Sequence, residues 1–147
     1  MTTIAYKDGI VAYDSRITEG SFVVDNNCDK MRKVQGLTFF VCGDVAGENA
    51  LIRSYVNGAC TEEDAETAAH SMAWVVDGGI IYRLLTLEGE LYIEPQRPGN
   101  HIALGSGTPF AIGAMDAGAS AMEAVKIAAQ RDVATGGKIR TWKIPTK

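Results

Sequence analysis

The dipeptide Asp8-Gly9 constrains the start of this chain more than any other short segment. It lies between two runs rich in strand-forming residues, 3–7 and 10–13. Asp-Gly is favoured in two-residue hairpin turns, because both central residues of such a turn adopt positive φ. The sequence therefore predicts an antiparallel hairpin over residues 3–13.

The register of this hairpin brings a carboxylate to the first residues of the chain. With Asp8-Gly9 as the turn, Thr3 faces Asp14 and Thr2 faces Ser15. Adjacent strands lie about 4.8 Å apart, so Asp14 should lie beside the start of the first strand. Strict alternation points Asp14 to the same side as Thr3, so a bend at the strand end is needed to bring it to Thr2.

Thr2 becomes chemically interesting if Met1 is removed, which small second residues such as Thr usually permit. A first-position Thr supplies a hydroxyl nucleophile and, in its own α-amine, a base that titrates near neutral pH. This combination is one of the convergent variants of the serine triad. The start of the sequence thus raises the hypothesis of a hydrolase.

The rest of the chain alternates between strand and helix patterns without a repeat or linker, which predicts a single α+β domain over residues 1–147. Capping boxes begin helices at Thr61 and Ser120, and Asn57-Gly58 and Gly136-Gly137 end helical segments. Further strands are predicted at 21–24, with 31–34 as its partner, and at 37–42, 80–86, 90–94, 102–104 and 138–144; helices are predicted at 47–56, from 61 to near 72, at 109–117 and from 120 to near 134.

Composition excludes several classes of protein. The 147 residues include 14 basic and 18 acidic side chains, a net charge of −4, which disfavours a binder of nucleic acid or of anionic membranes. The start lacks the pattern of a secretory signal, and no apolar run reaches the length of a membrane span, so we expect a soluble, cytoplasmic protein. Cys28, Cys42 and Cys60 lack C-x-x-C spacing, and neither His70 nor His101 is assigned to chemistry, so we expect no disulfide framework, metal or cofactor.

Five segments, in order along nearly the whole chain, resemble the proteasome β-subunit family of N-terminal nucleophile (Ntn) hydrolases, particularly the HslV-like branch and its smaller bacterial or phage members. "MTTIAYKDGIVAYDSR" is similar to the family's opening, which gives Thr2 as nucleophile and Asp14 as the carboxylate on the second strand. "DKMRKV" matches the segment of the family's essential lysine, here Lys30, and "FFVCGDVAGENALI" matches the oxyanion turn, here Gly43.

Two further segments complete the resemblance. "IALGSGTPFA" matches the run whose serine lies beside the nucleophile, here Ser106. "QRDVATGGKI" matches an Asp-x-x-Ser-Gly-Gly element, giving Asp132 and Thr135, with Thr where Ser is usual. The resemblance implies that Lys30 favours ionisation of the Thr2 hydroxyl, that Asp14 holds Lys30 in place, and that Gly43 stabilises the oxyanion. It also implies that Ser106, Asp132 and Thr135 orient the α-amine and a water molecule.

Each segment also has an ordinary structural interpretation. Gly105-Ser106-Gly107 suits a tight passage from strand to helix, residues 132–137 suit a helix end, and Lys30 lies in a charged run. Their shared order is what favours the family, since independent coincidences multiply.

The resemblance implies a four-layer αββα sandwich with shortened central helices, because the chain is shorter than HslV-like subunits between residues 56 and 80. It implies a threonine peptidase that acts on polypeptides in a homo-oligomeric ring and allows for an ATPase unfoldase as partner. Two alternatives stay open: a non-catalytic assembly or structural protein that retains Met1, and an amidase of small amides.

Overall fold

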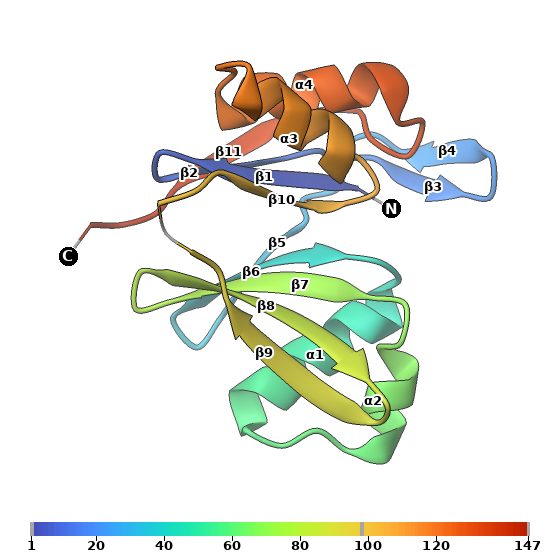
Figure 1. Cartoon of the computed structure of the whole chain (residues 1–147). Helices are drawn as coiled ribbons and strands as arrows, with labels where there is room; N and C mark the ends of the chain where they lie inside the picture. Colours follow the sequence, from blue (N-terminus) through green and yellow to red (C-terminus); the bar gives the residue numbers. More distant parts are fainter. Residues whose placement is uncertain (1, 98, 147) are drawn as a thin grey trace. The chain divides into compact units, whose positions relative to one another are not determined.

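The computed structural model describes residues 2–97 and 99–146 (Figure 1). The chain divides into two compact units: unit 1 comprises Met1–Lys30 and Gly99–Lys147, and unit 2 comprises Met31–Pro98. Each unit has its own sheet and its own pair of helices. The expectation of a single domain stays a prediction.

Unit 1 is built on a four-stranded antiparallel sheet in the order β10-β1-β2-β11, and its helices α3 and α4 pack on this sheet. A separate two-stranded hairpin pairs β3 with β4. The strands of unit 1 are β1 (Thr3–Lys7), β2 (Ile10–Tyr13), β3 (Ile17–Glu19), β4 (Phe22–Asp25), β10 (Ile102–Gly105) and β11 (Arg140–Lys143); its helices are α3 (Thr108–Asp116) and α4 (Ala121–Arg131).

The opening hairpin is confirmed residue by residue. Asp8 and Gly9 have φ values of 51° and 81°, as a two-residue turn with two left-handed residues requires. Tyr6 pairs with Val11, and Ile4 pairs with Tyr13, which is the predicted register. The carboxyl end of β2 therefore lies beside the start of β1.

Small side chains hold the helices of unit 1 close to its sheet. Ala5 and Ala12 of the sheet form one buried cluster with Ala111 and Met115 of α3 and with the α4 residues Ala121, Ala124 and Val125. The helix α4 begins with the predicted capping box, in which Ser120 and Glu123 each accept a backbone N–H from the other. This packing fixes the end of α4, from which Asp132 follows directly.

Unit 2 has a five-stranded antiparallel sheet in the order β5-β6-β7-β8-β9, with α1 and α2 packed on it. Asp44 and Thr61 cap the two helices, and Gly58 ends α1 in the left-handed conformation. The elements are β5 (Met31–Val34), β6 (Leu37–Cys42), α1 (Val45–Asn57), α2 (Glu62–Thr67), β7 (Met72–Asp77), β8 (Ile80–Leu87) and β9 (Glu90–Pro95). Its core includes Phe39, Leu51 and Leu84.

Two of the predicted strand assignments were wrong in part. β4 pairs with β3 and β5 pairs with β6, so the segments at 21–24 and 31–34 are strands but not partners. β7 follows α2 after four residues and was not predicted as a strand. The mixed α+β class was predicted correctly, and none of the helices among the described residues is long and apolar enough to cross a membrane.

Candidate functional site

Lys30 joins the predicted nucleophile to the predicted carboxylate. Its Nζ donates to Thr2 Oγ1 at 2.5 Å and to Asp14 Oδ1 at 2.9 Å. All three residues are buried, and the Asp14 side chain is fully so. Asp14 therefore reaches Thr2 through the ammonium group of Lys30 rather than by direct contact, which removes the need for the predicted bend.

Both carboxylate oxygens of Asp14 accept hydrogen bonds. Oδ1 accepts the backbone N–H of Thr3 at 3.2 Å, and Oδ2 accepts those of Gly136 at 2.9 Å and Arg16 at 3.3 Å. A buried carboxylate is tolerated only when it is paired and hydrogen-bonded, and Asp14 meets both conditions. It ties the start of β1, the end of β2 and the loop after α4 to one point.

The loop before Lys30 is fastened to the rest of unit 1. Arg16 Nε donates to Asn26 Oδ1 at 3.0 Å, and the N–H of Cys28 donates to the carbonyl of Ser15 at 3.0 Å. Tyr13 OH donates to Asp29 at 3.0 Å; burial and this hydrogen bond raise the pKa of Tyr13 well above its usual range. These contacts fix the direction from which Lys30 approaches Thr2.

Ser106, Asp132 and Thr135 form a second cluster in unit 1. Asp132 Oδ2 accepts the hydroxyl of Ser106 at 2.6 Å and that of Thr135 at 2.7 Å. Burial alone would raise the pKa of Asp132, but the hydrogen bonds from Ser106, Thr135 and the N–H of Ala134 outweigh it and lower the pKa. Ser106 Oγ also lies 3.5 Å from the carbonyl oxygen of Thr2, so this cluster adjoins the first.

Thr3 and Arg16, for which the sequence predicted no role in the site, connect these clusters. The Thr3 and Thr135 hydroxyls are 2.7 Å apart. Arg16 Nη1 donates to the carbonyls of Val133 at 3.1 Å and Thr135 at 3.4 Å. The hairpin register already placed Thr3 opposite Asp14, but its second partner lies 132 positions away and leaves no local signal.

Gly43, the predicted oxyanion donor, lies in unit 2 at the turn between β6 and α1. Its φ is 130°, a value that residues with a side chain rarely adopt, and a Cβ at this position would lie 2.5 Å from Ser71 Oγ. This packing is a structural reason for the glycine in its own right. Its catalytic role stays a prediction.

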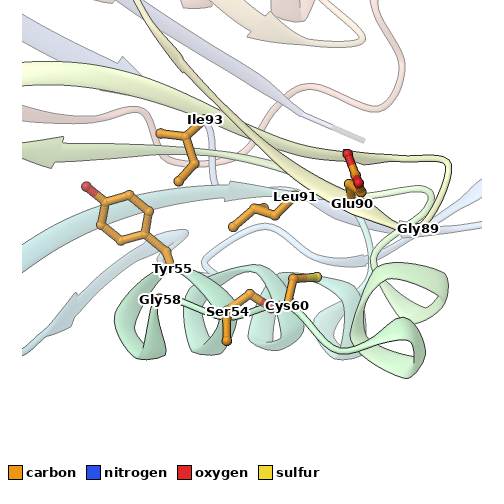
Figure 2. Close-up of a pocket in the computed structure, with 9 residues that line it drawn as sticks. Ser54, Tyr55, Gly58, Cys60, Gly89, Glu90, Leu91 and Ile93 are labelled. Carbon is orange, nitrogen blue, oxygen red and sulfur yellow. The ribbon is translucent and has the colours of Figure 1, made fainter.

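The predicted site residues do not line either of two cavities of about 280 Å³. One lies in unit 2 between α1 and β9, where Leu91 and Ile93 lie across from Ser54 and Tyr55 (Figure 2). The other lies in unit 1 beside the β3–β4 hairpin and the end of α4. Over residues 2–97 and 99–146, no group of three or more His, Cys, Asp or Glu side chains is arranged to hold a metal ion.

Comparison by sequence and by structure gave different results. No protein-family model and no curated protein sequence matches this chain. Among solved structures, HslV from Trypanosoma brucei matches with a TM-score of 0.72 at 18% identity, over 96% of this chain and 97% of that one. BPH from Thiobacillus denitrificans matches with a TM-score of 0.67 over 99% of both chains, at 16% identity in its complex with epoxomicin and at 18% in a second structure of BPH.

These matches extend over both units and nearly the full length of each relative. The resemblance drawn from the five segments is therefore confirmed at the level of the fold. The chain has the α+β fold of HslV and the proteasome β-type Ntn hydrolases.

Proposed function

We propose that this chain is a proteasome-like threonine peptidase whose nucleophile is Thr2, freed by removal of Met1. The contact of Lys30 Nζ with Thr2 Oγ1 at 2.5 Å is the observation that carries the proposal. An ammonium group held by a buried carboxylate has few structural reasons to contact a hydroxyl at the start of the chain. It has a clear chemical reason if that hydroxyl must become an oxyanion.

The proposed reaction uses the Thr2 α-amine as the base. Thr2 Oγ1 adds to the scissile carbonyl carbon as its proton passes to the α-amine, and the carbonyl oxygen becomes negative. The C–N bond then breaks, and the proton on the α-ammonium group goes to the leaving amine. Water adds to the resulting ester, gives a proton to the same amine, and Oγ1 leaves with that proton as the carboxylic acid is released.

Lys30 and Asp14 would serve the first step. The positive charge of Lys30 stabilises negative charge as it develops on Thr2 Oγ1, and Asp14 keeps Lys30 in place. While Met1 is attached, the nitrogen of Thr2 is an amide and cannot accept a proton. Activity is therefore expected only in the processed chain.

The second cluster would hold the base and the water. Ser106 lies next to the backbone of Thr2, and Asp132 fixes the direction of the Ser106 hydroxyl. Thr135 completes this arrangement from the other side of Asp132. Gly43 is proposed as the donor that stabilises the carbonyl oxyanion.

Substrates and assembly are proposed from the relatives and from the resemblance. The complex of BPH with epoxomicin suggests that a ligand of this kind can also engage the Thr2 site. We propose polypeptides as substrates, a homo-oligomeric ring as the working form, and an ATPase unfoldase as a further partner, in the cytoplasm of a bacterial or phage-infected cell.

Intact mass spectrometry with epoxomicin tests this proposal. The purified protein should lack the mass of Met1 and should gain the mass of one epoxomicin per chain. Thr2→Ala should give no adduct while keeping the circular dichroism spectrum and melting temperature of a folded protein, and Thr2→Ser should keep part of the reactivity.

The alternatives predict other outcomes of the same measurements. Quantitative retention of Met1 with no adduct would favour a non-catalytic assembly protein. A processed chain that hydrolyses small amides but neither peptides nor proteins would favour an amidase. An adduct on Thr2→Ala equal to that of the wild type would disprove the role of Thr2.

A further inference from the structure

We propose that Thr3 is a positioning residue of the Thr2 site. Its hydroxyl donates to Thr135 and thereby holds the Asp132 cluster (Ser106, Asp132 and Thr135) next to the Lys30 cluster (Thr2, Asp14 and Lys30). The inference rests on the proposed function. It concerns a residue next to the nucleophile to which neither the family resemblance nor the proposed reaction assigns a role. Its hydrogen bonds are the main evidence.

Thr3 contacts both clusters. Its backbone N–H donates to Asp14 Oδ1 at 3.2 Å, and its side-chain Oγ1 lies 2.7 Å from Thr135 Oγ1. Asp14 belongs to the Lys30 cluster, and Thr135 donates to Asp132. Thr3 thus lies at the junction between the two.

The direction of the Thr3–Thr135 hydrogen bond follows from counting protons. A Thr hydroxyl has one proton, and that of Thr135 goes to Asp132 Oδ2. Thr135 Oγ1 can therefore only accept from Thr3, which must be the donor. The result is a directed chain in which Thr3 donates to Thr135 and Thr135 donates to Asp132.

Packing leaves the Thr3 side chain little freedom. Thr3 is fully buried, and a Cβ on Gly107 would lie 1.9 Å from Thr3 Oγ1, so only a glycine at position 107 leaves room for this hydroxyl. On the sheet, Thr3 pairs with Gly105, next to Ser106. The Thr3 hydroxyl is thus enclosed by the segment that contains Ser106.

This chain of hydrogen bonds gives Thr3 a stated effect. A Thr135 hydroxyl that accepts from Thr3 is a stronger donor to Asp132, because linked hydrogen bonds polarise one another. Stronger donation stabilises the ionised form of Asp132, which in turn accepts the Ser106 hydroxyl beside Thr2. Loss of the Thr3 hydroxyl should therefore loosen Ser106 without touching Thr2 or Lys30.

The test compares Thr3→Val and Thr3→Ser with the wild type, each as the whole chain from which only Met1 has been removed. Val keeps the β-branched shape and removes the donor, whereas Ser keeps the donor. Carboxyl ¹³C NMR titration of Asp132 should show a raised pKa in Thr3→Val and a value near that of the wild type in Thr3→Ser. With a short fluorogenic peptide, kcat of Thr3→Val should fall about tenfold with KM unchanged, and Thr3→Ser should restore it.

The two readouts separate this inference from the proposed function. If the wild type hydrolyses nothing and Thr3→Val still shifts the Asp132 titration, the peptidase proposal fails and the hydrogen-bond link is upheld. Identical Asp132 titrations in all three proteins, or an unchanged kcat in Thr3→Val of an active enzyme, would overturn the role of Thr3. Should Thr3→Val not fold, Thr3→Ala replaces it in the same comparison with Thr3→Ser.

Discussion

At the scale of single residues, the site contains the buried ion pair of Lys30 and Asp14, in which Asp14 also accepts three backbone N–H groups. Removing one member of a buried pair leaves the other charge without compensation, which commonly costs about 3–5 kcal/mol. Asp14 would still keep three backbone N–H donors if Lys30 were lost. The fold should therefore tolerate a change at Lys30 better than the chemistry does.

We predict that Lys30→Ala lowers kcat for a short peptide by roughly 10²–10³-fold, the range seen when one group that stabilises developing charge is removed. The exposed Lys33, three residues later, is the matched control, and Lys33→Ala should stay within about twofold of the wild type. Thermal melts of both variants establish that the proteins are folded. Similar small losses at both positions would show that Lys30 does not act on Thr2.

The residues of the site divide by how local their signals are. Asp14 could be placed beside the start of the chain because an Asp-Gly turn sets the hairpin register. The resemblance, rather than any local rule, selected Lys30 from a charged run and Asp132 from a helix end. Thr3 and Arg16 were missed because their partners, the hydroxyl and the backbone carbonyl of Thr135, come close only in the folded chain.

At the scale of elements, turn and cap chemistry predicted more than hydrophobic patterning did. The Asp-Gly hairpin and the caps at Thr61 and Ser120 lie where the sequence predicted them. β7 was missed because its apolar run follows an alanine-rich segment, and periodicity alone does not separate a buried strand from a buried helix. β3 has three residues, too few to show an alternation.

Two glycines give a matched prediction about these elements. Gly43→Ala should destabilise the protein by about 1–3 kcal/mol, because it forces a strained φ and places a Cβ against Ser71. Gly113→Ala, inside the helix α3 and open to solvent, should stabilise it by about 0.5–1 kcal/mol. Urea unfolding measures the free energy of unfolding of both variants. An equal loss of stability in the two would contradict the difference expected between Gly43 and Gly113.

The capping box of α4 predicts a dependence of stability on pH. The backbone N–H of Ser120, and then its hydroxyl, lower the pKa of Glu123 from its usual value. A lowered folded-state pKa stabilises the protein above the unfolded-state pKa, and this gain is lost as pH falls through the folded value. The melting temperature of the wild type should exceed that of Glu123→Gln at pH 7, with the difference fading below about pH 4. A difference that is constant with pH would contradict the capping role.

At the scale of the whole molecule, fold similarity persists where sequence similarity is too weak for a family model to detect. HslV and BPH share 16–18% of residues with this chain and nevertheless match nearly all of it. The order of the five short segments predicted the same fold because each lies at a turn, strand end or helix end, where backbone conformation restricts the residue. Core positions restrict only size and polarity, so they diverge without changing the fold.

Assembly is the prediction that belongs to this scale. The solvent-exposed apolar side chains of unit 1 include four near the β3–β4 hairpin: Phe22, Val23 and Val24 on the hairpin and Val133 after α4, the last at 84%. Phe22, Val23 and Val133 line the same cavity, so three of these four side chains form one surface. In a closed ring each subunit presents one surface to a different surface of its neighbour, and burying these side chains would favour such a contact.

Native mass spectrometry at micromolar concentration should show a homo-oligomer, and Phe22→Ser with Val133→Asp should shift it toward the monomer. A stable wild-type monomer that still cleaves peptides would disprove the ring and leave the threonine mechanism in place, because every side chain of the Lys30 and Asp132 clusters comes from one chain.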